Sequence, residues 1–229
     1  MTVRIGVVIF PGSNCDRDTE RALALGGAEP VTLWHEQATL DGVAAVVLPG
    51  GFAYGDYLRA GVIARYSPVM RAVSAFAADG GLVLGICNGF QVLCEAGLLP
   101  GALRPNESLS FVCRDVALRV ERTDTPFLTR CETGQRLTIP VKHGEGCFFA
   151  DADLLAELDA AEQIVLRYDR DNPNGSVADT AAVINAEGNV MGLMPHPEHA
   201  VDALVGSTDG ALVLGSVVDA VRERSLTPA

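Results

Sequence analysis

Residues 82–100 read LVLGICNGFQVLCEAGLLP, and this stretch decides the fold class. Its first part, Leu82–Ile86, is a continuous apolar run that is typical of a strand buried on both faces. A turn flanked by glycines follows at Cys87, and a helix is expected over Phe90–Leu99 before a proline ends it. A strand joined to a helix by a tight turn is the building unit of α/β proteins, so the stretch predicts a sheet covered by helices.

The rest of the first hundred residues repeats this alternation. Apolar, β-branched runs predict three more strands, and amphipathic segments predict two more helices. We expect the strands at Val3–Phe10, Val31–Trp34 and Val43–Leu48, and the helices from Asn14 to Leu25 and over Val62–Ala78. Alternation of this kind implies parallel strands with helices on both faces of the sheet.

After Pro105 the pattern changes to shorter and more alternating strands, which favours antiparallel pairing. Strands are expected at Val112–Val120, Leu137–Val141, Ile164–Tyr168, Ala181–Asn185 and Val190–Met194, and a closing helix at Ala211–Arg222. No internal repeat or linker is visible. We therefore expect one α/β domain over residues 1–229, with a mostly parallel central sheet and an antiparallel addition in the C-terminal half.

Composition excludes several classes of protein. The chain has 229 residues and a formal net charge of −12, which argues against binding to nucleic acid or to anionic membranes. It is 48% hydrophobic and 20% charged, as a globular protein is. No apolar run approaches the length of a membrane span. The six cysteines show neither a C-x-x-C pair nor a metal-ligand spacing, so we expect free thiols, no metal site and a cytoplasmic location.

Cys87 is the strongest candidate for a catalytic residue. It lies in Gly85-Ile86-Cys87-Asn88-Gly89, directly after a buried strand and at the start of a helix, which is the context of a nucleophile elbow. The helix N-terminus favours the thiolate, and the backbone N–H of Asn88 would face a developing oxyanion. An isolated cysteine is more often a small buried apolar residue, and the other five lack this context.

His196 and Glu198 are the candidates for the base and its orienting acid. Both lie in Met194-Pro195-His196-Pro197-Glu198-His199, just beyond a strand end. In an extended segment, side chains two positions apart emerge on the same side, so Glu198 can fix the tautomer of His196. His199 would then point the other way and have a structural role. An ordinary surface pair is the alternative interpretation of His196 and Glu198.

A second oxyanion donor is expected from Gly50-Gly51, which ends another strand. Two glycines at a strand terminus can direct a backbone N–H into a site, and we assign that N–H to Gly51. An ordinary glycine-rich turn is the alternative interpretation, and on these residues alone the two are equally good.

Together these motifs resemble the class I, triad-type glutamine amidotransferases. The segments Pro49-Gly50-Gly51-Phe52, Gly85-Ile86-Cys87-Asn88-Gly89-Phe90-Gln91 and His196-Pro197-Glu198 carry the resemblance. Residues 51–61, GFAYGDYLRAG, narrow it to the family of glutaminase subunits of phosphoribosylformylglycinamidine synthase, which act in purine biosynthesis. The similarity extends from residues 10–16, FPGSNCD, to the His-Pro-Glu segment, and it implies a flavodoxin-like three-layer sandwich.

The resemblance also implies a mechanism and a substrate. Cys87 would attack the side-chain amide of L-glutamine, with His196 and Glu198 completing the triad and Gly51 and Asn88 forming the oxyanion hole. Substrate contacts carried over from the family map to Gln91, Gly144 and Glu145. For Gln91 a helix-capping role is the alternative, and for His143 a hydrogen-bonded loop role is preferred. Asp56 and Arg59 are open to either a substrate-side or a structural interpretation.

The partners expected by resemblance are a large synthetase subunit and a small bridging subunit. No G-x-x-x-x-G-K-[ST] segment occurs in the chain, so ATP and Mg²⁺ are expected on the synthetase and no cofactor on this subunit. Three alternatives are less favoured: another cysteine hydrolase on the same fold, a degenerate domain that only binds partners, and a sister amidotransferase that serves a different synthase.

Overall fold

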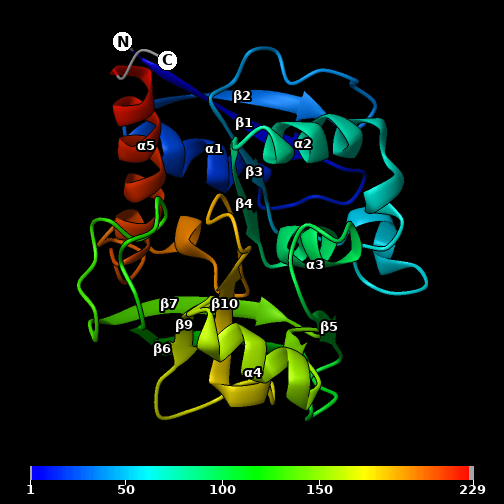
Figure 1. Ribbon diagram of the computed structural model, residues 1–229, viewed down its shortest axis with the longest axis vertical. Helices are drawn as coiled ribbons and strands as arrows, with labels where there is room; N and C mark the ends of the chain where they lie inside the picture. The colour runs from blue at the N-terminus through cyan, green and yellow to red at the C-terminus, as the bar shows by residue number, and fades with distance from the viewer. Residues whose placement is uncertain (1, 227–229) are drawn as a thin grey trace.

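The computed structural model describes residues 2–226, and a nine-stranded sheet forms the centre of this part of the chain (Figure 1). In spatial order its strands are β2, β1, β3, β4, β11, β10, β9, β6 and β7. Their bounds are β1 Val3–Ile9, β2 Ala28–Trp34, β3 Ala45–Leu48, β4 Leu82–Ile86, β6 Val112–Val120, β7 Arg136–His143, β9 Ile164–Tyr168, β10 Thr180–Ile184 and β11 Val190–Leu193. Two short strands, β5 Ala102–Arg104 and β8 Cys147–Phe149, pair separately.

The sheet has a parallel half and an antiparallel half. Strands β2, β1, β3, β4 and β11 are mutually parallel, whereas β10, β9, β6 and β7 continue the sheet with antiparallel pairing. The order 2-1-3-4 followed by a fifth parallel strand is the flavodoxin-like arrangement. The predicted fold class, a mostly parallel sheet with an antiparallel addition in the C-terminal half, is confirmed.

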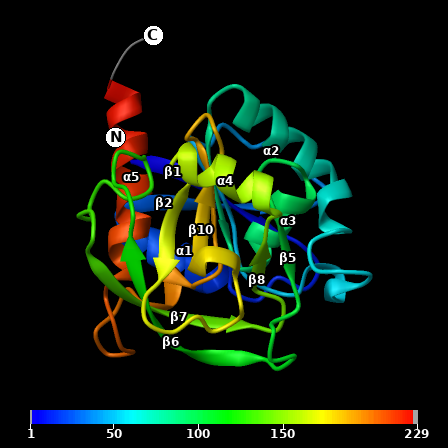
Figure 2. The ribbon, with the colours of Figure 1, turned by 60° about the horizontal axis from the view of Figure 1, so that its bottom comes forward.

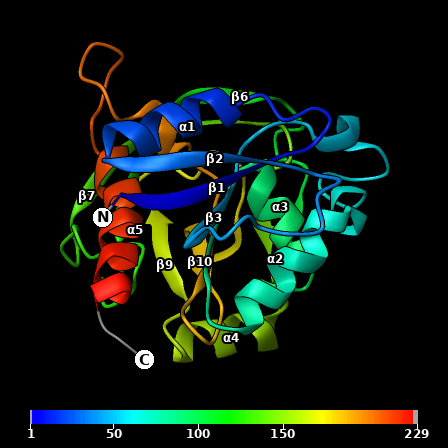
Figure 3. The ribbon, with the colours of Figure 1, turned by 90° about the horizontal axis from the view of Figure 1, so that it is seen from above.

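Helices cover both faces of the parallel half. On one face lie α1 Asp16–Leu25 and α5 Gly210–Leu226, and on the other lie α2 Pro68–Ala78 and α3 Asn88–Glu95 (Figure 3). Strands β3 and β4 are buried along their whole length between these layers, which explains their continuous apolar sequence. Helix α4, Ala152–Ala160, lies with the antiparallel strands at the bottom of Figure 1, the end that Figure 2 turns toward the viewer.

One predicted helix is wrong in part. Residues 62–78 do not form a single helix, because a 3₁₀ turn η2, Ala64–Tyr66, is separated from α2 by Ser67 in an extended conformation. Pro68 follows Ser67, and a proline disfavours helical geometry in the residue before it. Helix α4 and strands β5 and β8 were not predicted at all, whereas the other expected elements are present within a few residues of their predicted ends.

None of the helices among residues 2–226 combines the length and the apolar character that crossing a membrane requires.

Candidate active site

The candidate site lies where three neighbouring parallel strands end. β4 pairs with β3 on one side and with β11 on the other, with Leu48 opposite Gly85 and Leu193 opposite Ile86. Because the strands are parallel and in register, their carboxyl ends meet at one edge of the sheet. This is the edge at which open α/β sheets place their ligand sites.

Cys87 occupies a strained turn between β4 and α3. Its φ is 49° and its ψ is −103°, a left-handed φ that costs a non-glycine residue on the order of 1–3 kcal/mol. The glycines on either side allow the close approach that holds it there. A Cβ on Gly89 would lie 2.0 Å from the carbonyl oxygen of Leu48, and a Cβ on Gly85 would lie 2.7 Å from Gly89. The predicted elbow geometry is therefore present at Cys87.

His196 and Glu198 form a buried pair near Cys87. Nδ1 of His196 lies 2.6 Å from Oε1 of Glu198, and the residues are 2% and 3% exposed. Burial opposes the charged ring, but the carboxylate of Glu198, the charge and hydrogen bond of Cys87 and a hydrogen bond with Cys15 together favour it more, so the pKa of His196 is raised well above its ordinary value. Nε2 of His196 has no hydrogen-bond partner in the described structure, so it is the nitrogen available to Cys87.

The backbone around this pair differs from the predicted extended segment. Pro197–His199 forms a 3₁₀ turn, η4, with His196 at its N-terminal boundary. Residues three apart eclipse one another in a 3₁₀ turn, so His199 returns to the side of His196 and does not point away. The ring centroids of the two histidines are 5.3 Å apart, and Nδ1 of His199 is 3.6 Å from Oε1 of Glu198.

Gly50 and Gly51 pack against the site through their backbones. A Cβ on Gly50 would lie 2.6 Å from Cε1 of His196, and a Cβ on Gly51 would lie 2.7 Å from Cα of Ser13. Within residues 2–226, the N–H groups of Gly51 and Asn88 donate no hydrogen bond to another protein group. Both N–H groups are therefore free to bind an oxyanion, and their assignment to the oxyanion hole stays a prediction.

The side chain of Asn88 links the elbow to the neighbouring loop, a role that the sequence did not reveal. Its Oδ1 accepts from the N–H of Ala53 at 3.0 Å, and its Nδ2 donates to Gln91 at 2.9 Å and to Asp56 at 3.3 Å. Partial burial and the nearby charge of Glu145 raise the pKa of Asp56 to about 6, although the Asn88 hydrogen bond lowers it. Asp56 therefore belongs to the hydrogen-bond network around the elbow.

Gln91 and the loop that carries Gly144 and Glu145 are joined directly. Nε2 of Gln91 donates to the backbone oxygen of Glu145 at 2.6 Å. Both ends of the Gln91 amide thus have protein partners, and a substrate contact would need to replace one of them. The predicted contacts of Gln91, Gly144 and Glu145 with glutamine stay predictions.

A buried asparagine, which the sequence analysis missed, holds this loop. Oδ1 of Asn106 accepts from the N–H of Gly146 at 2.9 Å and lies 3.0 Å from Nδ1 of His143. Burial, followed by the charge of His196, lowers the pKa of His143 to about 4. The structure thus places His143 as a neutral, hydrogen-bonded residue at the end of β7, which agrees with the preferred hydrogen-bonded role but puts the residue on a strand and not in a loop.

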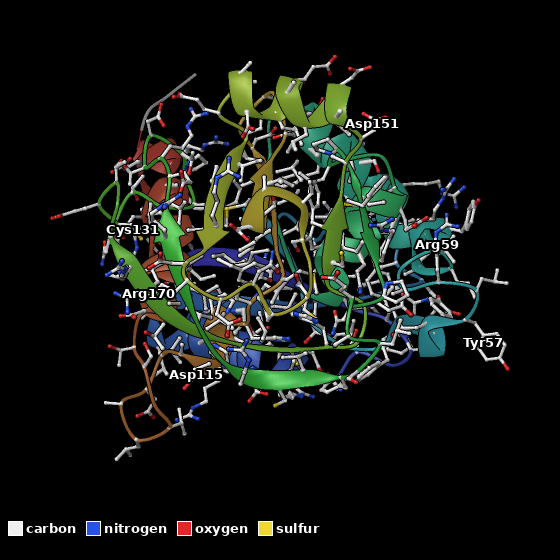
Figure 4. All side chains as sticks on the ribbon, turned by 90° about the horizontal axis from the view of Figure 1, so that it is seen from below. Tyr57, Arg59, Asp115, Cys131, Asp151 and Arg170 are labelled. Carbon is white, nitrogen blue, oxygen red and sulfur yellow. The ribbon has the colours of Figure 1, made fainter. Side chains whose placement is uncertain are left out.

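Arg59 lies on the outside of the molecule, on the same side as the exposed Tyr57 (Figure 4). Its guanidinium binds the carboxylate of Glu95 on α3 at 2.7 Å, which favours the structural interpretation of this residue.

Comparisons with known proteins show the family to which the chain belongs. Residues 2–210 match the family model described as the CobB/CobQ-like glutamine amidotransferase domain. The protein named phosphoribosylformylglycinamidine synthase subunit PurQ from Salinibacter ruber is 55% identical over 230 residues, which cover 96% of this chain and 98% of that protein. The protein of the same name from Rubrobacter xylanophilus is 59% identical over 216 residues, 94% of this chain and 98% of its own.

A solved structure has the same fold. A chain of the structure of PurLQS from Thermotoga maritima matches with a TM-score of 0.87 and 44% identity, and the match covers 96% of this chain and 99% of that one.

Proposed function

This chain belongs to the family of CobB/CobQ-like glutamine amidotransferase domains, and from that premise we propose that it is the glutaminase subunit of phosphoribosylformylglycinamidine synthase. The subunit hydrolyses L-glutamine to glutamate and ammonia. The ammonia is used by a synthetase subunit that converts formylglycinamide ribonucleotide into formylglycinamidine ribonucleotide in purine biosynthesis. Sequence identity along nearly the whole chain to proteins with this name supports the assignment.

The proposed mechanism gives each triad residue one task. The thiolate of Cys87 attacks the amide carbon of glutamine, and the proton held by His196 passes to the departing ammonia. The γ-glutamyl thioester that remains is attacked by water, whose proton His196 accepts, and Cys87 is released with glutamate. Glu198 keeps the imidazole oriented and stabilises its positive charge. The N–H groups of Gly51 and Asn88 stabilise the oxyanion of both tetrahedral intermediates.

One observation carries this mechanism. Cys87 is held at a φ of 49° and is close enough to the buried His196–Glu198 pair to raise the pKa of His196, whose Nε2 makes no hydrogen bond among the described residues. Strain of this kind persists only where the surrounding structure enforces it, and it is concentrated at functional sites.

The proposed assembly contains a large synthetase subunit and a small bridging subunit, and the similarity to a chain of PurLQS supports a role as one subunit among several. ATP and Mg²⁺ bind to the synthetase in this proposal, and the glutaminase uses no cofactor. A cytoplasmic location is proposed as well. The six cysteines are all unpaired, as expected in a reducing compartment.

The test compares two nitrogen sources in the assembled enzyme. Replacing the nucleophile, Cys87→Ala, is expected to lower the rate of synthesis from glutamine by several orders of magnitude. Synthesis from ammonium salts is expected to continue at the parent rate. Cys94→Ala is the matched control, because Cys94 is a partly buried thiol on the same helix, and it is expected to leave both activities intact. Glutamate release by the Cys87→Ala enzyme at the parent rate would refute the assignment.

A further inference from the structure

Four side chains of metal-binding types converge beside the triad. One ligand atom from each of Cys15, His196, Glu198 and His199 lies within 4.8 Å of all the others. The first three residues are buried and the fourth is partly buried. In a tetrahedral zinc site with bonds of 2.0–2.3 Å, ligand atoms are roughly 3.3–3.8 Å apart. A contraction of about 1 Å would therefore suffice to bring the four atoms around one ion.

Besides Nε2 of His196, two more polar atoms of this cluster make no hydrogen bond within residues 2–226. Oε2 of Glu198 and Nδ1 of His199 are buried and make no hydrogen bond among the described residues. Leaving a buried polar atom unpaired costs about 1–3 kcal/mol. Glu198 is 3% exposed, so its free oxygen is directed into the protein and not into solvent. The two free atoms point to a ligand that accepts electron pairs, as a metal ion does.

His199 is already oriented as a metal ligand. Its Nε2 lies 2.9 Å from Oδ2 of Asp18, which leaves Nδ1 on the side of Glu198. Metal-bound histidines usually donate their other N–H to a carboxylate, and this bond fixes the tautomer with a free electron pair toward the metal. Lys142 Nζ is farther from the same nitrogen, at 3.4 Å.

A cavity connects the cluster to the surface. It has a volume of about 310 Å³, and its lining includes Glu198 and His199. Asp18, Asp115 and Asp202 also line it, against only Arg21 and Lys142 as permanent cations. Acidic clefts concentrate cations. Cys87 is not among the residues that line this cavity, so the cavity offers a metal ion an approach to Glu198 and His199 that does not pass Cys87.

We propose that Cys15, His196, Glu198 and His199 bind one zinc ion, and that zinc bound there inhibits the glutaminase. A thiolate, two imidazoles and a carboxylate form a donor set that zinc prefers. The Cys15 thiol releases its proton to solvent on binding. Four protein ligands leave no open coordination position for water, so this ion would not be catalytic. It would take His196 and Glu198 out of the hydrogen bond that the triad needs.

The inhibition rests on the proposed function, whereas the binding does not. Binding is therefore measured first, by titrating zinc chloride into the full chain carrying Cys87→Ala and recording the heat. We expect one zinc ion per chain. Adding either Cys15→Ser or His199→Gln is expected to weaken the affinity at least tenfold. Adding Cys113→Ser, an exposed cysteine on β6, is the matched control and should change nothing.

Two results would overturn the site. The first is that the Cys87→Ala chain does not bind zinc, because the metal would then require the nucleophile. The second is that the Cys15→Ser and His199→Gln chains bind as tightly as their parent.

Inhibition is measured as glutamate release by the chain assembled with its synthetase. Zinc in excess is expected to lower the parent rate at least tenfold, and a chelator should restore it. Each variant is compared with its own rate without zinc, and Cys15→Ser is expected to lose less than half of that rate when zinc is added. Equal inhibition of this variant and the parent would overturn the inhibitory role. A chain that releases no glutamate under any condition would refute the proposed function, while the calorimetric titration would still decide the zinc site.

Discussion

The carboxylate of Glu198 stabilises the positive charge on His196. A single substitution tests this interaction. Replacement by glutamine, Glu198→Gln, keeps an oxygen that can accept from Nδ1 of His196 but removes the negative charge. We expect the rate of glutamine hydrolysis to fall on the order of 10²–10⁴-fold, less than for loss of the nucleophile. The measurement is kcat in the assembled enzyme, with the melting temperature as a check on folding. A variant as active as the parent would reduce the triad to a Cys–His dyad.

Asp56 provides a prediction about pH. Its pKa is raised from 3.8 to about 6 in the folded protein, so the folded state binds the proton more tightly than the unfolded chain does. The carboxylate therefore destabilises the fold increasingly as the pH rises from about 4 to about 6, and fully above that range. Asp56→Asn should remove the penalty. Allowing for solvent screening of a half-exposed group, we expect a gain of about 1 kcal/mol at pH 8, or roughly 2–4 °C in melting temperature.

The control for this prediction is Asp79→Asn, which alters an exposed carboxylate at the end of α2. Well below pH 3.8, Asp56→Asn and the parent should melt at nearly the same temperature, because Asp56 of the parent is then protonated in both the folded and the unfolded state. A stability gain for Asp56→Asn that does not change between pH 4 and pH 8 would contradict the interpretation.

The residues that follow strand ends could be predicted, and those that depend on tertiary packing could not. Cys87, His196 and Glu198 each lie in a short motif whose position after a strand is visible in the sequence. Cys15 reaches His196 only because α1 packs against η4, and no local pattern indicates that contact. The hydrogen bonds of Asn88 and Asn106 are likewise made across loops that are distant in sequence.

At the scale of elements, the start of α3 is fixed by its contact with β3. Gly89→Ala would place a Cβ 2.0 Å from the Leu48 carbonyl oxygen, a backbone atom that cannot move without displacing the strand. We expect a loss of stability of roughly 3 kcal/mol or more and a fall of about 6–12 °C in melting temperature, measured by calorimetry. Gly144→Ala is the control, since its Cβ would meet no atom closer than 3.8 Å. Equal melting temperatures for the two variants would show that the close approach of Gly89 to Leu48 does not determine the stability of the fold.

Strands with a clear apolar or alternating sequence pattern could be predicted, whereas a helix with a weak apolar pattern could not. β4 and β6 are found at their predicted bounds, because each is long and clearly apolar or alternating. Helix α4 was missed because its sequence, ADLLAELDA, buries little more than Leu158 and so carries only a faint helical period. The 3₁₀ turn η4 was also missed, since the prolines around His196 suggested extended backbone.

At the scale of the whole molecule, the burial of the active site predicts that glutaminase activity depends on the synthetase subunit. Cys87 is 5% exposed and His196 is 2% exposed, so we expect the surrounding loops to move when glutamine binds. Docking of the synthetase is expected to open and align the site, including the Gly50-Gly51 amide. Adding the synthetase subunit, its nucleotide and its amide substrate should raise glutamate release at least tenfold. Full glutaminase activity of the lone chain, unchanged by these additions, would contradict this dependence.

The position of β11 has a consequence for the order in which the protein acquires activity during synthesis. β11 is the last strand made, yet it lies in the middle of the sheet, where it joins β4 of the parallel half to β10 of the antiparallel half. Long-range parallel pairing of this kind forms slowly. A ribosome-bound chain that has already produced Cys87 still lacks β11 and His196, which follows that strand. The nascent enzyme therefore cannot consume glutamine, and a chain truncated before β11 would expose two unpaired strand edges to aggregation.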